Sequence, residues 1–112
     1  MSDLTSVRSI VLPDSLDKLI VALCQDYKRR QNAILERSFS SRTQMEYRYI
    51  NYRIEEGALE ICPINCVESF IDEIAMRRGY AGSSIDCMSE STYKRQKQEI
   101  KYNVARKLHL ID

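Results

Sequence analysis

Hydrophobic residues in the first half of the chain recur at steps of three and four, the spacing that places side chains on one face of a helix. The first helix is expected to begin at Pro13-Asp14-Ser15 and to run to about Arg37. The second is expected to start near Ser41 and to end at Cys62-Pro63, because proline disfavours helix at the residue before it. Two such helices predict an antiparallel hairpin over residues 14–62. The expected inward positions are Leu16, Ile20, Leu23, Tyr27 and Ile34, then Tyr47, Ile50, Ile54, Ala58 and Ile61, with Met45, Tyr49 and Tyr52 widening the second face.

Two residues within these helices do not fit the pattern. Arg30 interrupts the apolar face of the first helix. Gly57 lies inside the second, where glycine costs about 1 kcal/mol relative to alanine. The pair Gly57-Ala58 therefore predicts either a kink or a close approach between two helices.

The second half of the chain predicts two further helices. One opens at Asn65 or Cys66 and ends at Arg77-Arg78-Gly79, a cationic last turn followed by a glycine C-cap. The other starts behind Ser89, a good N-cap residue, after a connector in which Ile85 could form a short helical turn. The inward positions are Val67, Phe70, Ile71, Ile74 and Ala75, then Tyr93, Ile100, Val104, Leu108 and Ile111. The outward positions are Glu68, Asp72 and Glu73, then Lys94, Arg95, Lys97, Lys101, Arg106 and Lys107.

Composition supports an all-α fold of about four helices in a single domain over residues 1–112. The chain has three glycines and two prolines, and strand-like alternation of polar and apolar residues is nearly absent. Residues 1–12 are expected to form an arm whose apolar end packs on the helices. A chain of this length can bury a core, although dimerisation would help to stabilise it.

Charge is distributed unevenly along the chain, although the net charge of +1 gives no overall nucleic-acid signature. From Met88 to the end, six basic residues stand against three acidic ones, whereas residues 41–79 have a net charge of −2. A polyanion would therefore meet the C-terminal end first. A capped helix start beside a cationic face suits contact with a phosphate backbone or the major groove. The alternative is an ordinary amphipathic terminal helix with a solvated Lys/Arg face.

Several other functional classes are not favoured. No signal peptide or membrane-spanning stretch is visible, so we expect a cytoplasmic protein with free thiols. Cys62 and Cys66 are separated by three residues, which is not the paired spacing of a zinc site, and buried cysteines are the better interpretation. His109 is the single histidine and lacks a nearby nucleophile in sequence, and no phosphate-binding glycine loop occurs. We expect no enzyme activity, cofactor or metal.

Residues 87–111 resemble a known family of DNA-binding proteins. The run Met88-Ser89-Glu90-Ser91-Thr92-Tyr93-Lys94-Arg95 is similar to the start of the recognition helix in sigma-factor region 4. It is closer to small phage-encoded regulators of the ArpU type, which carry a segment like Ile-Ser-Glu-Ser-Thr-Tyr-Tyr-Arg. Their tail, Ala-x-x-Leu-Gly-Leu-Ile, corresponds to Ala105–Ile111 here. The resemblance implies that residues 65–112 form a helix-turn-helix-like part.

The resemblance also implies a role for each residue of the motif. Met88 would be the apolar residue of the turn, Ser89 the N-cap and Tyr93 the inward anchor. The implied DNA-contacting residues are Glu90, Ser91, Thr92, Lys94, Arg95 and Lys97, with Lys101 continuing the cationic face. The scaffold helix would be either a short turn around Ile85 or the helix from Val67 to Arg78.

Together these features predict a DNA-binding transcriptional regulator of phage or prophage type that binds double-stranded DNA. It would use the helix from Ser89 for recognition and could form a homodimer through its N-terminal helices. The alternative is a small helical protein-interaction or assembly module that has lost DNA binding. In that case Tyr47, Tyr49 and Tyr52 could form an interface, since tyrosine suits interfaces, although a place in the core with the hydroxyls at its rim is the better interpretation.

Overall fold

The computed structural model describes residues 12–37, 40–77, 79–82 and 88–111. The predicted all-α fold with about four helices is confirmed: α2 and α3 together occupy the first predicted helix, and α4, α5 and α6 occupy the other three. Two short 3₁₀ turns flank α5. The helices are α2 (Asp14–Gln25), α3 (Tyr27–Glu36), α4 (Ser41–Leu59), α5 (Val67–Met76) and α6 (Glu90–Lys107), and the 3₁₀ turns are Ile64–Cys66 and Tyr80–Gly82.

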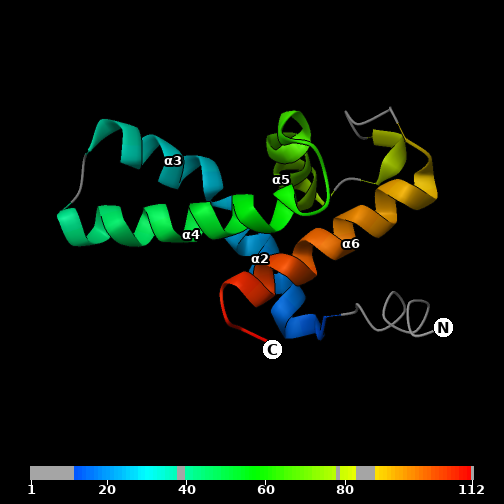
Figure 1. Cartoon of the computed structure of the whole chain (residues 1–112), viewed down its shortest axis with the longest axis horizontal. Coiled ribbons are helices and arrows are strands. Elements are labelled where there is room, and N and C mark those ends of the chain that lie inside the picture. Colours follow the sequence, from blue (N-terminus) through cyan, green and yellow to red (C-terminus); the bar gives the residue numbers. More distant parts are fainter. Residues whose placement is uncertain (1–11, 38–39, 78, 83–87, 112) are drawn as a thin grey trace.

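The first predicted helix is interrupted at Asp26, which has φ −95° and ψ 3°. As a result α3 pairs with α4, whereas α2 packs against α5 and α6. The hairpin therefore consists of α3 and α4, and Figure 1 shows it extending away from the other helices. The start of α6 lies at the opposite end of the molecule.

Arg30 bridges this interruption. Its side chain is 3% exposed, and its Nε donates to Oδ1 of Asn51 on α4 at 2.7 Å. Its Nη2 donates to the carbonyl oxygen of Leu23 in the last turn of α2. The side chain of Arg30 thus donates to a carbonyl oxygen in the last turn of α2 and, at the same time, to a side chain on α4. Arg30 breaks the apolar pattern because it is a buried link between α2, α3 and α4.

The core lies where α2, α4, α5 and α6 meet. Most positions predicted as inward are buried or half-buried, including Leu12 at the end of the predicted arm. Residues 1–11 of that arm lie outside the described residues. The side chains at the centre, each at most 2% exposed, include Ile20, Ile54, Ala58, Phe70, Ile71, Ile74, Tyr93, Ile100, Val104 and Ala105.

Gly57 marks a close approach of α4 to α6. A Cβ added at Gly57 would lie 2.9 Å from the backbone nitrogen of Val104 and 3.2 Å from the carbonyl carbon of Asn103. Nδ2 of Asn103 donates to the carbonyl oxygen of Gly57 at 3.4 Å. Of the two predicted roles of Gly57, close helix packing is therefore the one observed, and α4 is continuous through it.

Two assignments of side chains to helix faces are wrong. Met45, Tyr49 and Tyr52 are 70%, 43% and 59% exposed rather than part of the inward face of α4. Conversely, Glu73 on α5 was expected to face outward but is fully buried. The hydroxyl of Tyr93 donates to Glu73 Oε1 at 2.8 Å, which supplies the polar partner that a buried carboxyl group requires.

The end of α5 also differs from the prediction. The residue in the left-handed conformation is Arg77, with φ 54° and ψ 35°, and not Gly79. The N–H of Arg77 bonds the carbonyl oxygen of Ile74 at 3.2 Å, so the turn closes before the glycine is reached. A side chain at positive φ is strained relative to glycine.

Replacing Arg77 by glycine is therefore expected to raise the free energy of unfolding by about 1 kcal/mol, because glycine adopts this conformation without the steric cost. Urea unfolding followed by circular dichroism measures the change. Arg77→Ala is the control, since alanine removes the same side chain but keeps the strain. An equal gain from both variants would contradict the role of backbone strain.

Candidate nucleic-acid interface

Ser89 is the N-cap of α6, as predicted. Its Oγ accepts a hydrogen bond from the backbone N–H of Thr92 at 3.3 Å. The hydroxyls of Ser89 and Thr92 are also 3.0 Å apart. The cap satisfies one of the donors that a helix start leaves without a partner, and it fixes the first turn of α6.

An aromatic cluster holds the first turns of α6 against the rest of the molecule. Tyr93 is 1% exposed, and its ring centroid lies 6.0 Å from that of Phe70 and 5.4 Å from that of Tyr80. The hydroxyl of Tyr80 donates to the carbonyl oxygen of Met88 at 2.7 Å. The predicted inward position of Tyr93 is confirmed, and its neighbours place the helix start firmly on α5.

Four of the predicted DNA-contacting residues lie exposed at the start of α6: Glu90, Ser91, Lys94 and Arg95. We refer to these four residues as the α6 contact surface. Nζ of Lys94 lies 2.9 Å from Oε2 of Glu90, and Nε of Arg95 lies 3.9 Å from Oε2 of Glu99. Exposed ion pairs of this kind contribute about 0–1 kcal/mol, so an incoming phosphate can compete with them.

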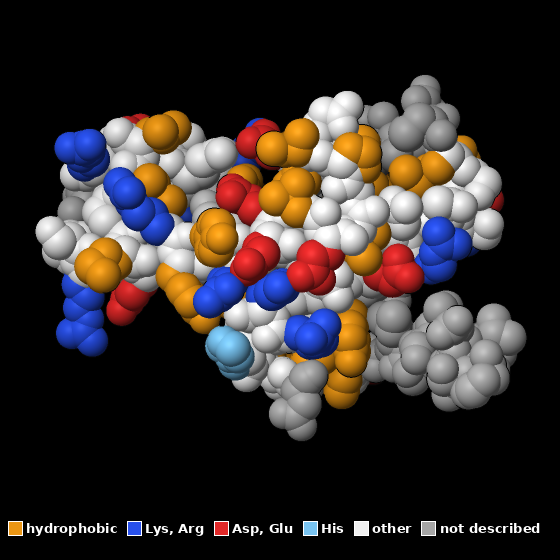
Figure 2. Space-filling view, viewed as in Figure 1, with side chains coloured by type: hydrophobic (Ala, Val, Ile, Leu, Met, Phe, Trp, Pro, Cys, Tyr) orange, Lys and Arg blue, Asp and Glu red, His pale blue; other side chains and the backbone are white. Residues whose placement is uncertain are grey.

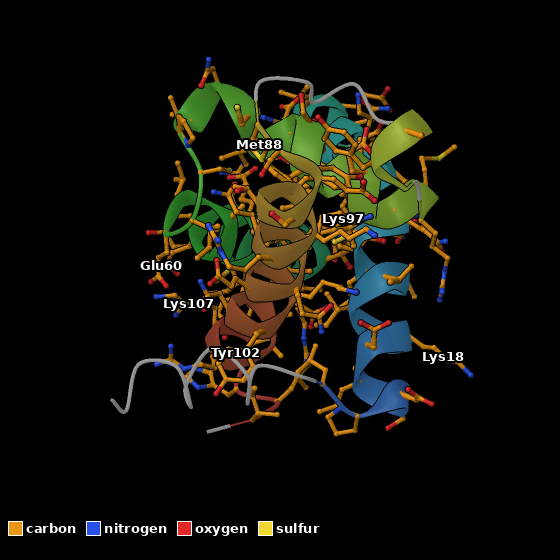
Figure 3. All side chains as sticks on the ribbon, turned by 90° about the vertical axis from the view of Figure 1, so that its right-hand side faces the viewer. Lys18, Glu60, Met88, Lys97, Tyr102 and Lys107 are labelled. Carbon is orange, nitrogen blue, oxygen red and sulfur yellow. The ribbon has the colours of Figure 1, made fainter. Side chains whose placement is uncertain are left out.

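The other three predicted contact residues are less available. Thr92 is half-buried beside the cap, and Lys101 binds Asp17 on α2 with Nζ 2.7 Å from Oδ1. Nζ of Lys97 lies 5.2 Å from the ring centroid of Tyr93, and Figure 3 shows Lys97 on the side of α6 that is turned toward α2. Sequence reasoning missed Asp17, because nothing along the chain indicates that α2 crosses α6 at this point.

Lys94, Lys97 and Lys101 nevertheless share a shallow hollow of about 250 Å³, together with Gly79, Tyr93 and Gln98. Burial lowers the pKa of Lys97, the nearby charge of Lys101 lowers it further, and the carboxylate of Glu73 opposes both effects. Because Asp17 and Glu90 bind two of these lysines, the hollow is a mixed site rather than a purely cationic one.

Charges of both signs are also intermixed elsewhere. Figure 2 shows Lys/Arg and Asp/Glu side chains next to one another across the middle of one face. Nζ of Lys107 lies 2.7 Å from Oε2 of Glu60, and Figure 3 shows the two side chains side by side. Part of the cationic face predicted for α6 is thus neutralised by ion pairs with carboxylates on α2 and at the end of α4. This pairing weakens the positive electrostatic potential that a distant polyanion would meet.

Of the two predicted scaffolds, only the helix from Val67 can be compared with the structure. Ile85 lies outside the described residues. The other candidate, α5, contacts α6 through Phe70 and Glu73, but it ends at Met76, whereas α6 begins at Glu90.

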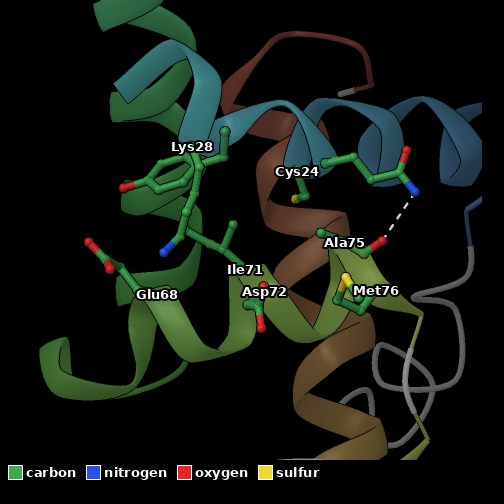
Figure 4. A pocket seen from close by; sticks show the side chains of 9 residues that line it. Cys24, Lys28, Glu68, Ile71, Asp72, Ala75 and Met76 are labelled. Carbon is green, nitrogen blue, oxygen red and sulfur yellow. Dashed lines mark hydrogen bonds between the residues drawn. The ribbon is translucent and has the colours of Figure 1, made fainter. Parts of the chain in front are cut away.

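A separate groove of about 370 Å³ lies between α2, α3 and α5 (Figure 4). Cys24, Ile71 and Met76 supply much of its apolar lining, and Nε2 of Gln25 donates across it to the carbonyl oxygen of Ala75 at 3.1 Å. Burial raises the pKa of Cys24 to about 12, so its thiol stays protonated and unreactive at neutral pH. The groove therefore offers shape but no activated nucleophile.

The cysteines and acidic residues form no metal site within the described residues. Cys24, Cys62 and Cys66 carry free thiols, and Cys87 lies outside the described residues. No group of three or more His, Cys, Asp or Glu side chains in the described part could hold a metal ion. Among the described helices, none is both long enough and apolar enough to cross a bilayer. Comparison with known proteins returned no match among the family models, the curated proteins or the solved structures.

Proposed function

We propose that this chain is a cytoplasmic DNA-binding regulator of phage type, which presents the start of α6 to double-stranded DNA. One observation carries the proposal: a capped helix start that is held by a buried tyrosine exposes Lys94 and Arg95 together with Ser91 and Glu90. Helix N-termini attract phosphate, and exposed side chains in the first two turns can reach phosphates or base edges.

One copy would bind weakly. The α6 contact surface has two exposed cations per copy, Lys94 and Arg95, which allow about two phosphate contacts, and for two contacts affinity falls about tenfold as the salt concentration rises from 50 to 200 mM. Glu90 would repel phosphate unless it receives a hydrogen bond from a base. We therefore propose that the regulator acts as a homodimer joined through its N-terminal helices, which doubles the contacts and raises the affinity.

Fluorescence anisotropy with a labelled duplex of mixed sequence tests this function. The wild-type chain is expected to bind at about 50 mM salt and to weaken at least tenfold at 200 mM, as expected for phosphate contacts. The variant Lys94→Ala/Arg95→Ala is expected to lose at least tenfold in affinity at the lower salt. It should keep its helical circular dichroism, because both side chains point away from the core.

The matched control is Lys18→Ala/Lys28→Ala, which removes the same charge from exposed positions on α2 and α3. Equal weakening in both double variants would mean that net charge, and not the α6 contact surface, drives binding. Absence of wild-type binding at low salt would overturn the proposed function.

A helical interaction module remains the second candidate, and one observation favours it. Met45, Tyr49 and Tyr52 are exposed on α4, where apolar and aromatic side chains suit contact with another protein. Tyr47 differs from them: its ring lies 5.3 Å from the guanidinium carbon of Arg29, and its hydroxyl accepts from Arg29 Nη1 at 3.2 Å. This module would keep its partner when Lys94 and Arg95 are replaced.

A further inference from the structure

The outer side of α4 carries an apolar patch flanked by charged residues. Met45 is 70% exposed, Tyr49 is 43% exposed and Tyr52 is 59% exposed. A hollow of about 350 Å³ lies beside them, lined by Met45, Glu46, Tyr49 and Ile50. We define the α4 surface as Arg42, Met45, Glu46, Tyr49, Tyr52, Arg53 and Glu56.

The first part of this surface lies where the hairpin extends away from the other helices (Figure 1), and its last residue, Glu56, precedes Gly57, where α6 packs on α4. Asn51 contacts α3 and Gly57 contacts α6 from other sides of the helix, whereas Glu56, at the end of the α4 surface, lies near α6 with its Oε2 4.0 Å from Nζ of Lys107. Exposed aromatic and methionine side chains on a projecting hairpin form the kind of patch that proteins use for association.

The order of charges along the α4 surface identifies the partner. Arg42 and Glu46 precede Tyr49, and Arg53 and Glu56 follow it. When a second copy of α4 lies antiparallel with the two Tyr49 residues adjacent, Arg42 faces Glu56 of the other copy. Glu46 then lies opposite position 52 of the other copy, one residue and about 1.5 Å along the helix axis from Arg53. Parallel pairing would instead place like charges opposite each other.

We propose that two copies of this chain pair antiparallel through the α4 surface, with the Tyr49 residues at the twofold axis. The inference deepens the proposed function by naming the partner and the surface through which the regulator dimerises. Such an interface is isologous: each copy contributes the same residues, so the assembly closes at two copies.

The part of the α4 surface around Arg53 is already ordered within one copy. The guanidinium carbon of Arg53 lies 5.1 Å from the ring centroid of Tyr49 and 5.9 Å from that of Tyr52. Nη1 of Arg53 lies 2.8 Å from Oε1 of Glu56, whereas Nε of Arg42 is 3.6 Å from Oε2 of Glu46 in a largely exposed pair. Positions 49 and 52 of the second copy then cover the hollow beside Met45. Restricted side chains lose little entropy on association, which favours binding.

Sedimentation velocity over a range of protein concentrations tests the pairing without DNA. The wild-type chain is expected to convert from monomer to dimer as the concentration rises. Glu46→Arg and Arg53→Glu are each expected to weaken dimerisation at least tenfold, because each variant creates two repulsive contacts across the interface. An equimolar mixture of the two variants is expected to restore the dimer, because both contacts then join opposite charges.

Lys18→Glu is the control for a charge reversal on an exposed position of α2, and its dimerisation should match the wild type. The proposal is overturned if the wild-type chain stays monomeric, if it grows into larger oligomers, or if the mixture dimerises no better than either variant. The outcome is independent of the DNA measurement. A dimer that does not bind DNA would reject the proposed function and keep this pairing, whereas a monomer that binds DNA would do the reverse.

Discussion

Replacing Gly57 by alanine is expected to lower the free energy of unfolding by about 2 kcal/mol, although alanine is the better helix former by about 1 kcal/mol. The reason is the contact between α4 and α6. The added Cβ would lie 2.9 Å from the backbone nitrogen of Val104 and 3.0 Å from its Cγ2. Backbone atoms cannot rotate away, so the two helices would have to separate and the buried side chains around Ile54 and Ile100 would lose contact.

Urea unfolding monitored by circular dichroism measures this loss. Gly79→Ala is the matched control, because nothing lies within 4 Å of a Cβ at Gly79. This control is expected to leave stability unchanged or slightly higher, since alanine restricts the unfolded chain. A gain in stability for Gly57→Ala would mean that helix propensity outweighs the close contact between α4 and α6.

Replacing Arg30 by methionine is expected to cost about 3 kcal/mol of stability. Methionine keeps much of the volume but removes the donors that bond Asn51 Oδ1 and the carbonyl oxygen of Leu23. Both acceptors would then lose the bond from Arg30 at a buried site. Burial also lowers the pKa of Arg30, because it disfavours the charged guanidinium. The carboxylate of Asp26, 3.4 Å away, and the two hydrogen-bond acceptors stabilise that charge.

Arg29→Met is the control for this substitution. Arg29 is the neighbouring residue and bonds the same Asp26 carboxylate, with Nη2 2.5 Å from Oδ2, but its side chain is 55% exposed. Water can replace an exposed partner, so we expect a loss of less than about 1 kcal/mol. Similar losses for the two variants, measured by thermal and urea unfolding, would show that Arg30 contributes by packing alone.

Local sequence signals predicted much of the fold. Ser89 was recognisable because a capping hydroxyl precedes a helical pattern, and the three-four spacing identified Ile54, Ile100 and Val104 as core residues. These features depend on neighbours within one or two helical turns. Gly57 also carried a readable signal, since glycine inside a long helix is costly unless another backbone approaches it.

Features that depend on distant residues could not be predicted. Beside the interruption at Asp26, Arg30 bonds Asn51, which lies twenty-one residues further along the chain. Glu73 has the spacing of a surface residue on α5, but the hydroxyl of Tyr93 on α6 donates to it. An outward or inward position on a helix depends on which helices pack nearby, and the spacing of one helix does not contain that information.

In the candidate interface, too, local spacing placed some residues correctly but could not reveal contacts with distant helices. Lys94 and Arg95 were correctly placed on the outside, because they point away from the apolar stripe of their own helix. Lys101 lies on the same predicted face but binds Asp17, since α2 crosses α6 there. DNA contact by these residues stays a prediction, and the two exposed cations are the ones on which the anisotropy experiment depends.

In the proposed pair, the uninterrupted helix α4 would set the distance between the two copies of α6. Tyr49, at the twofold axis, and Gly57, where α6 packs, are eight residues apart on one rigid helix, or about 12 Å along its axis. The two Gly57 positions would therefore lie about 24 Å apart along the paired helices, and each fixes the position of its own α6. The separation between the two copies of the α6 contact surface, and hence between two half-sites on a duplex, would be set by α4 and not by a flexible linker.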